Sequence, residues 1–237
     1  MKRRLRYKRL LLKVSGEVFG GKGASIDFDR VSDFARELKG AVGAGCEVAV
    51  VIGGGNLLRG YRASERGIDR VAADTMGMLG TIINAIALQA ALERAGVEAH
   101  VMTALAIEQY AEHYVRRQAL DHLENGRVVI LAGGTGNPYF TTDTAAALRA
   151  VEVKADVLLK GTKVDGIYDS DPVKNPRAKR IGRLGYLDVL GQDLRVMDAT
   201  AVALCRENGI PIVVFNIMEK GNLRKLLEGK LSGTIVS

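Results

Sequence analysis

The sequence is poor in the residues that several common kinds of functional site require. Its two cysteines, Cys46 and Cys205, are far apart and form no Cys-x-x-Cys pair, so neither a zinc ribbon nor a dithiol redox centre is expected. The three histidines, His100, His113 and His122, show no metal-ligand spacing and no serine or cysteine nucleophile motif nearby, which disfavours zinc chemistry and hydrolytic triads. We expect the cysteines to be small core residues and the histidines to lie on the surface or to pack against helices.

The patterns of membrane spans and of two familiar nucleotide-binding loops are also missing. The chain has no run of about 18 uninterrupted apolar residues, which disfavours a transmembrane helix. It has no Gly-x-x-x-x-Gly-Lys-Ser/Thr, and the glycines at 53–55 are followed by Leu58 where a dinucleotide fingerprint needs glycine or alanine. Neither a P-loop nor a Rossmann cofactor site is therefore predicted. No internal repeat or low-complexity linker divides the chain.

Composition is that of an ordinary soluble globular protein. The chain has 237 residues, of which 47% are hydrophobic and 26% are charged, enough for one α/β domain with a large core. Six of its seven net positive charges lie in a basic N-terminal tail, residues 1–9, which leaves the rest near neutral. Leu10, Leu11 and Leu12 follow this tail, but Lys13 and Glu17 interrupt the apolar stretch before it reaches the length of a secretory signal. We expect a cytoplasmic protein.

Short apolar runs alternate with amphipathic stretches along the whole chain, which predicts an α/β fold with strands covered on both faces. One helix is predicted over 29–42. A second, over 69–95, is apolar on nearly every face at its centre. Such a helix must be buried on two sides, and we expect the sheet on one side and the same helix of another subunit on the other. The predicted strands are Leu10–Val14, Glu47–Ile52, Glu98–Met102, Val128–Ala132, Asp156–Lys160 and Ile212–Phe215.

The segment Gly134–Asp143, which reads Gly-Thr-Gly-Asn-Pro-Tyr-Phe-Thr-Thr-Asp, is the most informative part of the sequence. It follows the predicted strand Val128–Ala132 and precedes a helix-forming run. In α/β folds ligands bind at such junctions, because the amide groups at the start of the helix favour anions. The glycines, hydroxyls, amide and carboxylate of the segment therefore indicate a site for a phosphorylated ligand.

Lysines stand at the carboxyl ends of two predicted strands, at Lys13 and Lys160, and each is followed by a glycine-containing turn. Taken alone, each lysine is equally well explained by a side chain that lies along the sheet with its head in water, and the glycines at 53–55 by a plain turn. Together, four strand ends carry glycine-rich or hydroxyl-rich loops without a cysteine or histidine nucleophile. Phosphoryl transfer fits this set of residues, because it depends on positioning and on charge stabilisation more than on covalent chemistry.

Five segments together resemble the bacterial uridylate kinases, a branch of the amino-acid kinase superfamily. They are Lys13–Glu17, Val51–Gly60, Asp74–Leu79, Gly134–Asp143 and Leu159–Tyr168, so the match spans nearly the whole chain. The strand-end lysines and glycine loops are shared by the superfamily, whereas the Gly-Asn-Pro-Tyr-Phe-Thr-Thr-Asp loop is specific to the uridylate branch. The resemblance implies a three-layer α/β/α sandwich around a mainly parallel twisted sheet, assembled as a homohexamer. It also implies transfer of the γ-phosphoryl group of ATP to UMP in pyrimidine nucleotide biosynthesis, with Mg²⁺ held mainly by nucleotide phosphates.

The resemblance assigns roles to individual positions. Lys13 and Lys160 would stabilise the transferring phosphoryl group, and Asp143 would orient one of them or the metal. Residues 10–154 would form mainly the phosphate-acceptor half and residues 155–237 mainly the ATP-binding half. The implied ATP contacts are Lys13, Val14, Ser15, Gly16, Gly55, Arg59, Thr162, Tyr168 and Asp171. The implied UMP contacts are Gly54, Asp74, Thr135, Gly136, Asn137, Pro138, Tyr139, Phe140, Thr141 and Thr142. From the residues alone, Asp171 could accept from ribose hydroxyls or could simply begin an Asp-Pro turn.

Two other classes remain open. A kinase for another small phosphate acceptor, or a nucleotide-binding storage protein of the same fold, would keep the glycine loops, but the Gly134–Asp143 loop argues against both. A nucleic-acid-binding regulator would work through residues 2–9, where six phosphate contacts would give a log–log salt slope of about −5 on duplex DNA. Basic ends without interleaved aromatic residues, apart from Tyr7, are more often solvated tails.

The segment Gly20–Ser25 departs from the family pattern in a region that relatives use for activation by GTP, and Gln89 and His100 stand where some relatives place arginines, although Arg127 is present. Fewer cations bind a triphosphate less well, so we predict a weak or altered response to GTP, while UTP remains an expected inhibitor. Steady-state rates measured with and without GTP check this, and several-fold activation at sub-millimolar GTP would contradict it.

Overall fold

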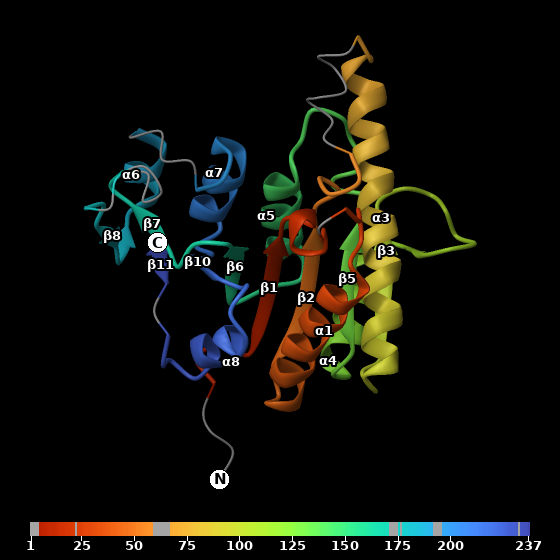
Figure 1. Ribbon diagram of the computed structural model, residues 1–237, viewed down its shortest axis with the longest axis horizontal. Helices are drawn as coiled ribbons and strands as arrows, with labels where there is room; N and C mark the ends of the chain where they lie inside the picture. Colours follow the sequence, from red (N-terminus) through yellow and green to blue (C-terminus); the bar gives the residue numbers. More distant parts are fainter. Residues whose placement is uncertain are drawn as a thin grey trace.

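A nine-stranded sheet runs through the centre of the protein (Figure 1), in a computed structural model that describes residues 5–21, 23–58, 67–170, 175, 177–191, 196–231 and 233–237. The strand order is β4-β3-β5-β2-β1-β6-β10-β11-β9, and every neighbouring pair is parallel except β10 with β11. The strands are β1 (Arg9–Val14), β2 (Glu47–Ile52), β3 (Ala99–Thr103), β4 (Glu112–His113), β5 (Val128–Ala132), β6 (Val157–Thr162), β9 (Arg183–Leu184), β10 (Ile212–Asn216) and β11 (Thr234–Val236). A separate hairpin pairs β7 (Ile167–Tyr168) with β8 (Arg180–Ile181).

Helices cover both faces of the sheet, so the predicted three-layer α/β/α sandwich is confirmed. One face packs against α1 (Phe28–Gly43), α3 (Arg70–Arg94) and α8 (Asn222–Leu227). The other packs against α4 (Arg116–Glu124), α5 (Thr142–Glu152), α6 (Tyr186–Gly191) and α7 (Ala199–Glu207). A short 3-10 helix, η1 (Gly16–Val18), follows β1.

Strand alternation decides which helix layer each side chain meets. Along β1, Leu10, Leu12 and Val14 belong to the core on the α1 and α3 side, whereas Leu11 belongs to the core on the α5 and α7 side. Successive side chains of a strand point to opposite faces. Because helices cover both faces, the central strands are apolar over most of their length, as their sequences indicate.

All six predicted strands are present; β2 and β5 have the predicted ends, and the ends of the other four differ by at most two residues. Asp156 lies just outside β6, because its carboxylate accepts hydrogen bonds from the backbone N–H groups of Lys8 and Arg9, each at 2.8 Å. The remaining strands, β4, β7, β8, β9 and β11, have only two or three residues each. Segments that short carry too little periodicity to be found from the sequence.

The basic N-terminal tail is shorter than predicted. Arg9 is the first residue of β1, and its Nε lies 2.5 Å from the buried carboxylate of Glu47. Lys8 pairs with the same carboxylate at 3.1 Å. Two of the six cations proposed to contact nucleic acid are therefore engaged by the protein itself, which weakens that alternative.

Helix α3 runs along one side of the molecule (Figure 1) and is buried on one face only in the single chain. Leu88 and Leu92 are fully buried, while Met76, Leu79, Ile83 and Ile86 form an exposed apolar stripe spaced by three, four and three residues. By length and composition alone α3 could also cross a membrane, but the core helix of a soluble protein passes the same test.

Cys46 and Cys205 are both buried, as predicted for small core residues. Burial raises the pKa of each thiol to about 12, so neither is a reactive thiolate at neutral pH.

Candidate active site

Lys13 and Lys160 lie side by side on adjacent central strands. Lys13 of β1 is the register partner of Lys160 of β6. Each lysine is two residues beyond a leucine, Leu11 or Leu158, that packs in the α5 and α7 core. Alternation therefore directs both lysine side chains toward the same helix layer. Two ammonium groups thus approach one point from separate strands, as their shared position in the sequence pattern predicts.

Asp143 joins the two lysines from α5. One carboxylate oxygen, Oδ1, lies 2.6 Å from Lys13 Nζ, and the other, Oδ2, accepts a hydrogen bond of 2.9 Å from Lys160 Nζ. Asp143 is held in place by the N-cap of α5, where the Thr141 hydroxyl accepts from the backbone N–H groups of Asp143 and Thr144. We call these three side chains the Lys-Asp-Lys group.

Burial and charge act in opposite directions on this group. Burial by itself would raise the pKa of Asp143, but Lys13 and Lys160 outweigh it and hold that pKa below its ordinary value. Burial also lowers the pKa of Lys160, and Asp143 offsets part of this effect. The carboxylate is therefore ionised at neutral pH, and two cations contact one anion, which leaves an excess of positive charge within the group that the Asp198 carboxylate partly offsets.

Asp198 was missed by the sequence analysis. It is the N-cap of α7, where it accepts from the backbone N–H of Ala201, and it also accepts hydrogen bonds from the hydroxyls of Thr141 and Thr144. It therefore fixes the start of α5, on which Asp143 sits. The sequence signal is an aspartate placed before a helix-forming run, but nothing in the sequence shows that this cap reaches a second helix.

The glycine loops after β1 and β2 are packed against each other. A Cβ on Gly16 would lie 2.3 Å from Asn56 Oδ1 and 2.4 Å from the carbonyl oxygen of Gly53, so no larger residue fits there. Buried Asn84, another residue not predicted, ties the loop after β2 to α3 by donating to the Gly53 carbonyl and to Asn56 Oδ1, each at 2.8 Å. A Cβ on Gly53 would also be 3.6 Å from the Thr142 hydroxyl. The loops that follow β1, β2 and β5 therefore meet at one place.

A cavity of about 210 Å³ opens beside this meeting point. Its lining includes six of the predicted UMP contacts, together with Gly55, and these six are Gly54, Asp74, Asn137, Phe140, Thr141 and Thr142. A carboxylate oxygen of Asp74 accepts from the backbone N–H of Tyr139 at 2.8 Å and pairs with Arg70 at the same distance. This bond holds Tyr139 at a φ of 72°, a backbone conformation that is uncommon for residues other than glycine.

A second cavity, of about 180 Å³, is lined in part by Lys160. Lys160, Thr162 and Tyr168 line it, along with apolar residues that include Ile167 and Val214. The Tyr168 hydroxyl donates to Asp165 at 2.6 Å, and this hydrogen bond raises the pKa of the phenol. Lys160 thus lines the second cavity. Its partner Asp143 directly follows Thr142, which lines the first cavity. The Lys-Asp-Lys group therefore stands between the two cavities.

Comparison with known proteins decides the family. The sequence pattern of the amino acid kinase family matches residues 8–216. The chain belongs to the amino acid kinase family. The predicted resemblance to this superfamily is therefore confirmed.

Solved structures of amino acid kinases named as UMP or uridylate kinases are similar over almost the whole chain. A UMP kinase from Bacillus anthracis is 42% identical with a TM-score of 0.94, covering 98% of this chain and 96% of that one. A UMP kinase from Ureaplasma parvum is 40% identical with a TM-score of 0.92, covering 98% and 99%. A uridylate kinase from Archaeoglobus fulgidus is 28% identical with a TM-score of 0.75, covering 96% and 99%.

The remaining predicted contacts of this chain fall into three groups. Arg59 and Asp171 lie outside the described residues. Thr135, Gly136 and Pro138 belong to the loop before α5, where a Cβ on Gly136 would meet Ala104 at 3.3 Å. Val14 and Ser15 lie at the end of β1 and at the N-cap of η1.

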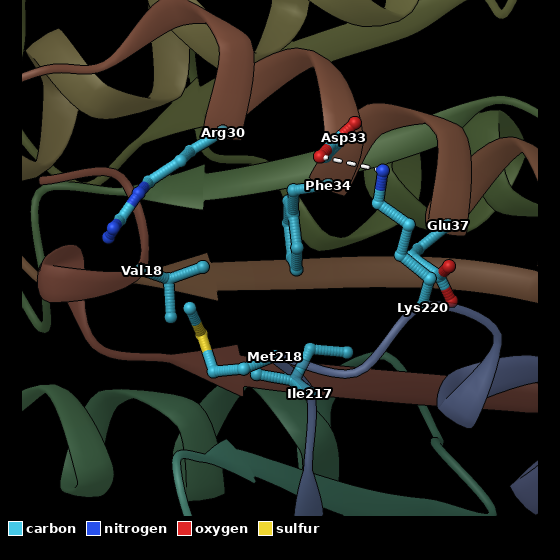
Figure 2. A pocket seen from close by; sticks show the side chains of 8 residues that line it. All are labelled: Val18, Arg30, Asp33, Phe34, Glu37, Ile217, Met218 and Lys220. Carbon is cyan, nitrogen blue, oxygen red and sulfur yellow. Dashed lines mark ion pairs between the residues drawn. The ribbon is translucent and has the colours of Figure 1, made fainter. Parts of the chain in front are cut away.

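A further cavity, of about 90 Å³, lies elsewhere (Figure 2). Val18, Phe34, Ile217 and Met218 supply its apolar lining, and Lys220 reaches across its rim to pair with Asp33 at 3.2 Å. None of the nucleotide contacts predicted from the sequence is among its lining residues.

Two of the three histidines lie together although they are far apart in the sequence. The rings of His100 and His122 stack with centroids 3.7 Å apart, and both face the carboxylate of Glu112. His113 is exposed, as expected. His100, Glu112 and His122 come from two strands and a helix, so their spacing in the sequence follows no known metal-binding motif.

Replacing Asp143 by asparagine tests the electrostatic balance of the Lys-Asp-Lys group. We expect D143N to lower the free energy of unfolding by about 3–5 kcal/mol at pH 7, because two buried ammonium groups lose their counter-charge. A depressed carboxyl pKa contributes stability above the ordinary pKa, and this contribution is lost as pH falls through the depressed value. The difference between D143N and the parent protein should therefore shrink on acidification, as measured by urea unfolding.

The matched control is Asp121→Asn, which changes an exposed aspartate of α4 and should alter stability by less than about 1 kcal/mol. Equal stability of D143N and the parent at pH 7 would contradict the assigned balance.

Proposed function

We propose that this protein transfers the γ-phosphoryl group of ATP to UMP, giving ADP and UDP, in pyrimidine nucleotide biosynthesis in the cytoplasm. The observation that carries the proposal is the Lys-Asp-Lys group standing between two cavities. Two nucleotides that bind with their phosphates toward each other need such an arrangement. The identity of 40–42% to proteins named UMP kinases supports UMP as the acceptor.

In the proposed mechanism, Lys13 and Lys160 stabilise negative charge on the phosphoryl group as it passes between the nucleotides. Charge stabilisation and alignment dominate this chemistry. The excess positive charge of the Lys-Asp-Lys group supplies the charge stabilisation. Asp143 holds both ammonium groups in position. It need not act as a base, because the second ionisation of a phosphate monoester has a pKa near about 6, so the attacking oxygen of UMP is already ionised at neutral pH.

We assign ATP to the cavity lined by Thr162 and Tyr168 and to the loop Lys13–Gly16. The polar Thr162 and the ring of Tyr168 suit the nucleoside, while the amides after β1 suit its phosphates. Gly55 and the two undescribed positions, Arg59 and Asp171, complete the proposed ATP set.

We assign UMP to the cavity between α3 and the loop before α5. Gly54 lets the loop after β2 pack directly against α3, since a Cβ there would meet the Gly77 carbonyl oxygen at 2.6 Å. Asp74, through its bond to the Tyr139 amide, ties α3 to the loop 135–142. This division gives residues 10–154 mainly to the phosphate acceptor and residues 155–237 mainly to ATP.

Mg²⁺ is the proposed cofactor, carried by the nucleotide phosphates. The Asp143 carboxylate already faces two ammonium groups, at 2.6 and 2.9 Å, so it is a poor primary ligand for a cation that prefers oxygen ligands and water. The residues fit a metal that arrives with ATP, where it would offset phosphate charge.

We also propose a weak response to GTP, while inhibition by UTP stays a prediction from the resemblance. His100 faces the carboxylates of Glu98 and Glu112, and Arg127 pairs with Glu98 at 2.8 Å. These cationic or polar groups are engaged within the chain, which leaves less positive charge for a triphosphate.

The catalytic assignment is tested by ADP release in a coupled assay with ATP, Mg²⁺ and UMP, CMP or dTMP as acceptor. We expect UMP to be the best acceptor, and Lys13→Ala to lower turnover on the order of 10² to 10³ with the fold intact. Lys220→Ala, which removes an exposed lysine paired with Asp33, is the control and should leave turnover unchanged. Unaltered turnover in K13A, or ADP release that needs no acceptor, would contradict the proposal.

We further propose a homo-oligomer, a hexamer by resemblance, in which the exposed stripe of α3 packs against a second copy. Its three, four, three spacing is that of a helix-packing seam. Ile83→Asp should reduce the mass measured by sedimentation across a range of concentrations, because it places a charge in the proposed contact. Leu187→Asp, at an exposed leucine of α6, should not. A wild-type monomer at every concentration, or an I83D protein of unchanged mass, would contradict this interface.

A further inference from the structure

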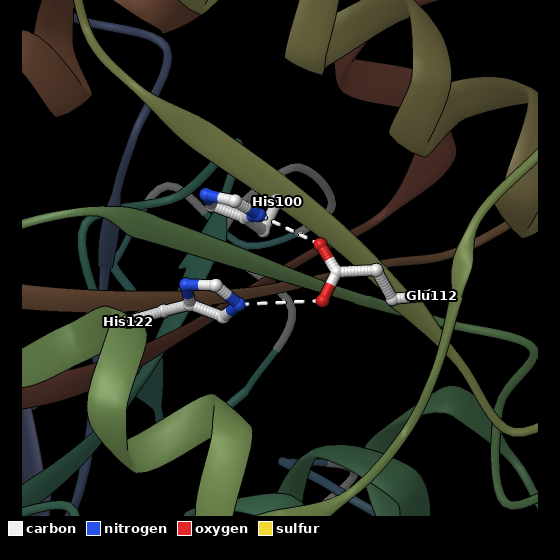
Figure 3. A group of neighbouring side chains, drawn as sticks. All are labelled: His100, Glu112 and His122. Carbon is white, nitrogen blue, oxygen red and sulfur yellow. Dashed lines mark hydrogen bonds and ion pairs between the residues drawn. The ribbon is translucent and has the colours of Figure 1, made fainter.

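We propose that His100, Glu112 and His122 form a binding site for a divalent transition-metal ion, of which Zn²⁺ is the best match. Figure 3 shows the two imidazole rings stacked, with one nitrogen of each ring aimed at the Glu112 carboxylate. His100 Nδ1 lies 2.7 Å from Glu112 Oε1, and His122 Nε2 lies 3.3 Å from Oε2. The site is at the β4 edge of the sheet, and none of its three side chains belongs to the proposed nucleotide site.

The fold brings these residues together through the strand alternation that also aligns the lysines. His100 is two residues before Met102, which packs in the core on the α4 side, so His100 points toward the same layer. Glu112 of β4 is the register partner of Met102. His122 comes from α4, one residue before buried Leu123. Three elements thus each contribute one ligand to the same point.

The three side chains can converge on one tetrahedral ion once the imidazole rings rotate, because the in-plane nitrogen lone pairs of two rings stacked at 17° to each other do not point at a common metal. Bonds from zinc to histidine nitrogen and carboxylate oxygen are about 2.0–2.2 Å, which places neighbouring ligand atoms roughly 3.3 Å apart. One ligand atom from each of the three side chains already lies within 4.8 Å of the other two. Two imidazoles and one carboxylate leave a fourth position for water, and imidazole nitrogen favours zinc-like metals over Mg²⁺.

The surroundings provide further support. The second nitrogen of His100, Nε2, lies 3.2 Å from Glu98 Oε1. A carboxylate behind a ligating histidine fixes the ring and strengthens it as a donor.

Arg127 opposes metal binding through His122. Its NH1 lies 3.2 Å from His122 Nδ1, and an arginine can only donate, so His122 carries its proton on Nε2 in this arrangement. Binding a metal through Nε2 moves that proton to Nδ1, where it would face the Arg127 donor. The metal must therefore displace the arginine, which predicts that removing Arg127 tightens binding.

The test is binding of Zn²⁺ alone to untagged, nucleotide-free protein, by competition with a chromophoric chelator. We expect one Zn²⁺ per chain, a rise in Tm of roughly 5 °C at saturating metal, and at least about a 100-fold loss of affinity in His122→Asn and in Glu112→Gln. His113→Asn is the matched control, because this third histidine is exposed beside Glu112, and it should bind as the parent does. Circular dichroism checks that each variant is folded.

Arg127→Met provides an independent test of the geometry and should bind Zn²⁺ several-fold more tightly than the parent. The proposal is overturned if the parent binds no Zn²⁺, or if folded H122N and E112Q retain its affinity. Unchanged or weaker binding in R127M would overturn the assignment of His122 as an Nε2 ligand.

Discussion

Two buried ammonium groups that share one carboxylate are the interaction on which the rest of the site depends. Moving an ion out of water costs several kcal/mol, whereas an opposite charge about 4 Å away returns about 4 kcal/mol at an effective dielectric of 20. For a single Lys–Asp pair, the favourable charge interaction would roughly cancel the cost of burial. The second lysine of the Lys-Asp-Lys group leaves one positive charge compensated only in part, by Asp198, and a phosphoryl group can compensate it further. The same imbalance that strains the unliganded protein therefore favours a phosphorylated ligand.

The sheet makes this arrangement possible because parallel strands place their carboxyl ends together. Lys13 and Lys160 are neighbours in register, and helix α5 begins where their side chains arrive. The start of α5 is fixed by Thr141 and, from another helix, by Asp198. Around this point the glycine loops are packed so closely that Gly16 and Gly54 could not carry a Cβ. Rigid loops and fixed charges require no reorganisation when charge develops on the substrate, which is the basis of electrostatic catalysis.

Helix α3 has one face that packs in the core and another that is exposed, and the two faces have different roles. One face completes the core and carries Asn84 and Asp74 to the glycine loops and to Tyr139. The other presents an apolar stripe centred on Ile83. If this stripe is covered by a second copy, as we propose, assembly would restrain the helix that borders the proposed acceptor cavity. The cluster of His100, Glu112 and His122, which we propose to bind a metal ion, is built from β3, β4 and α4 and shares no element with this interface.

The sequence by itself determined the α/β class, the six longer strands, the two long helices, and the lysines and glycine loops at the strand ends. These features are local, because periodicity, turn residues and strand-end position are read within a few residues. Only the tertiary structure decided which side chains meet: Asp198 with Thr144, Asn84 with Gly53, and His100 with Glu112 and His122. These partners lie 10 to 54 residues apart, and the contacts follow from strand order and helix packing, which no local pattern encodes.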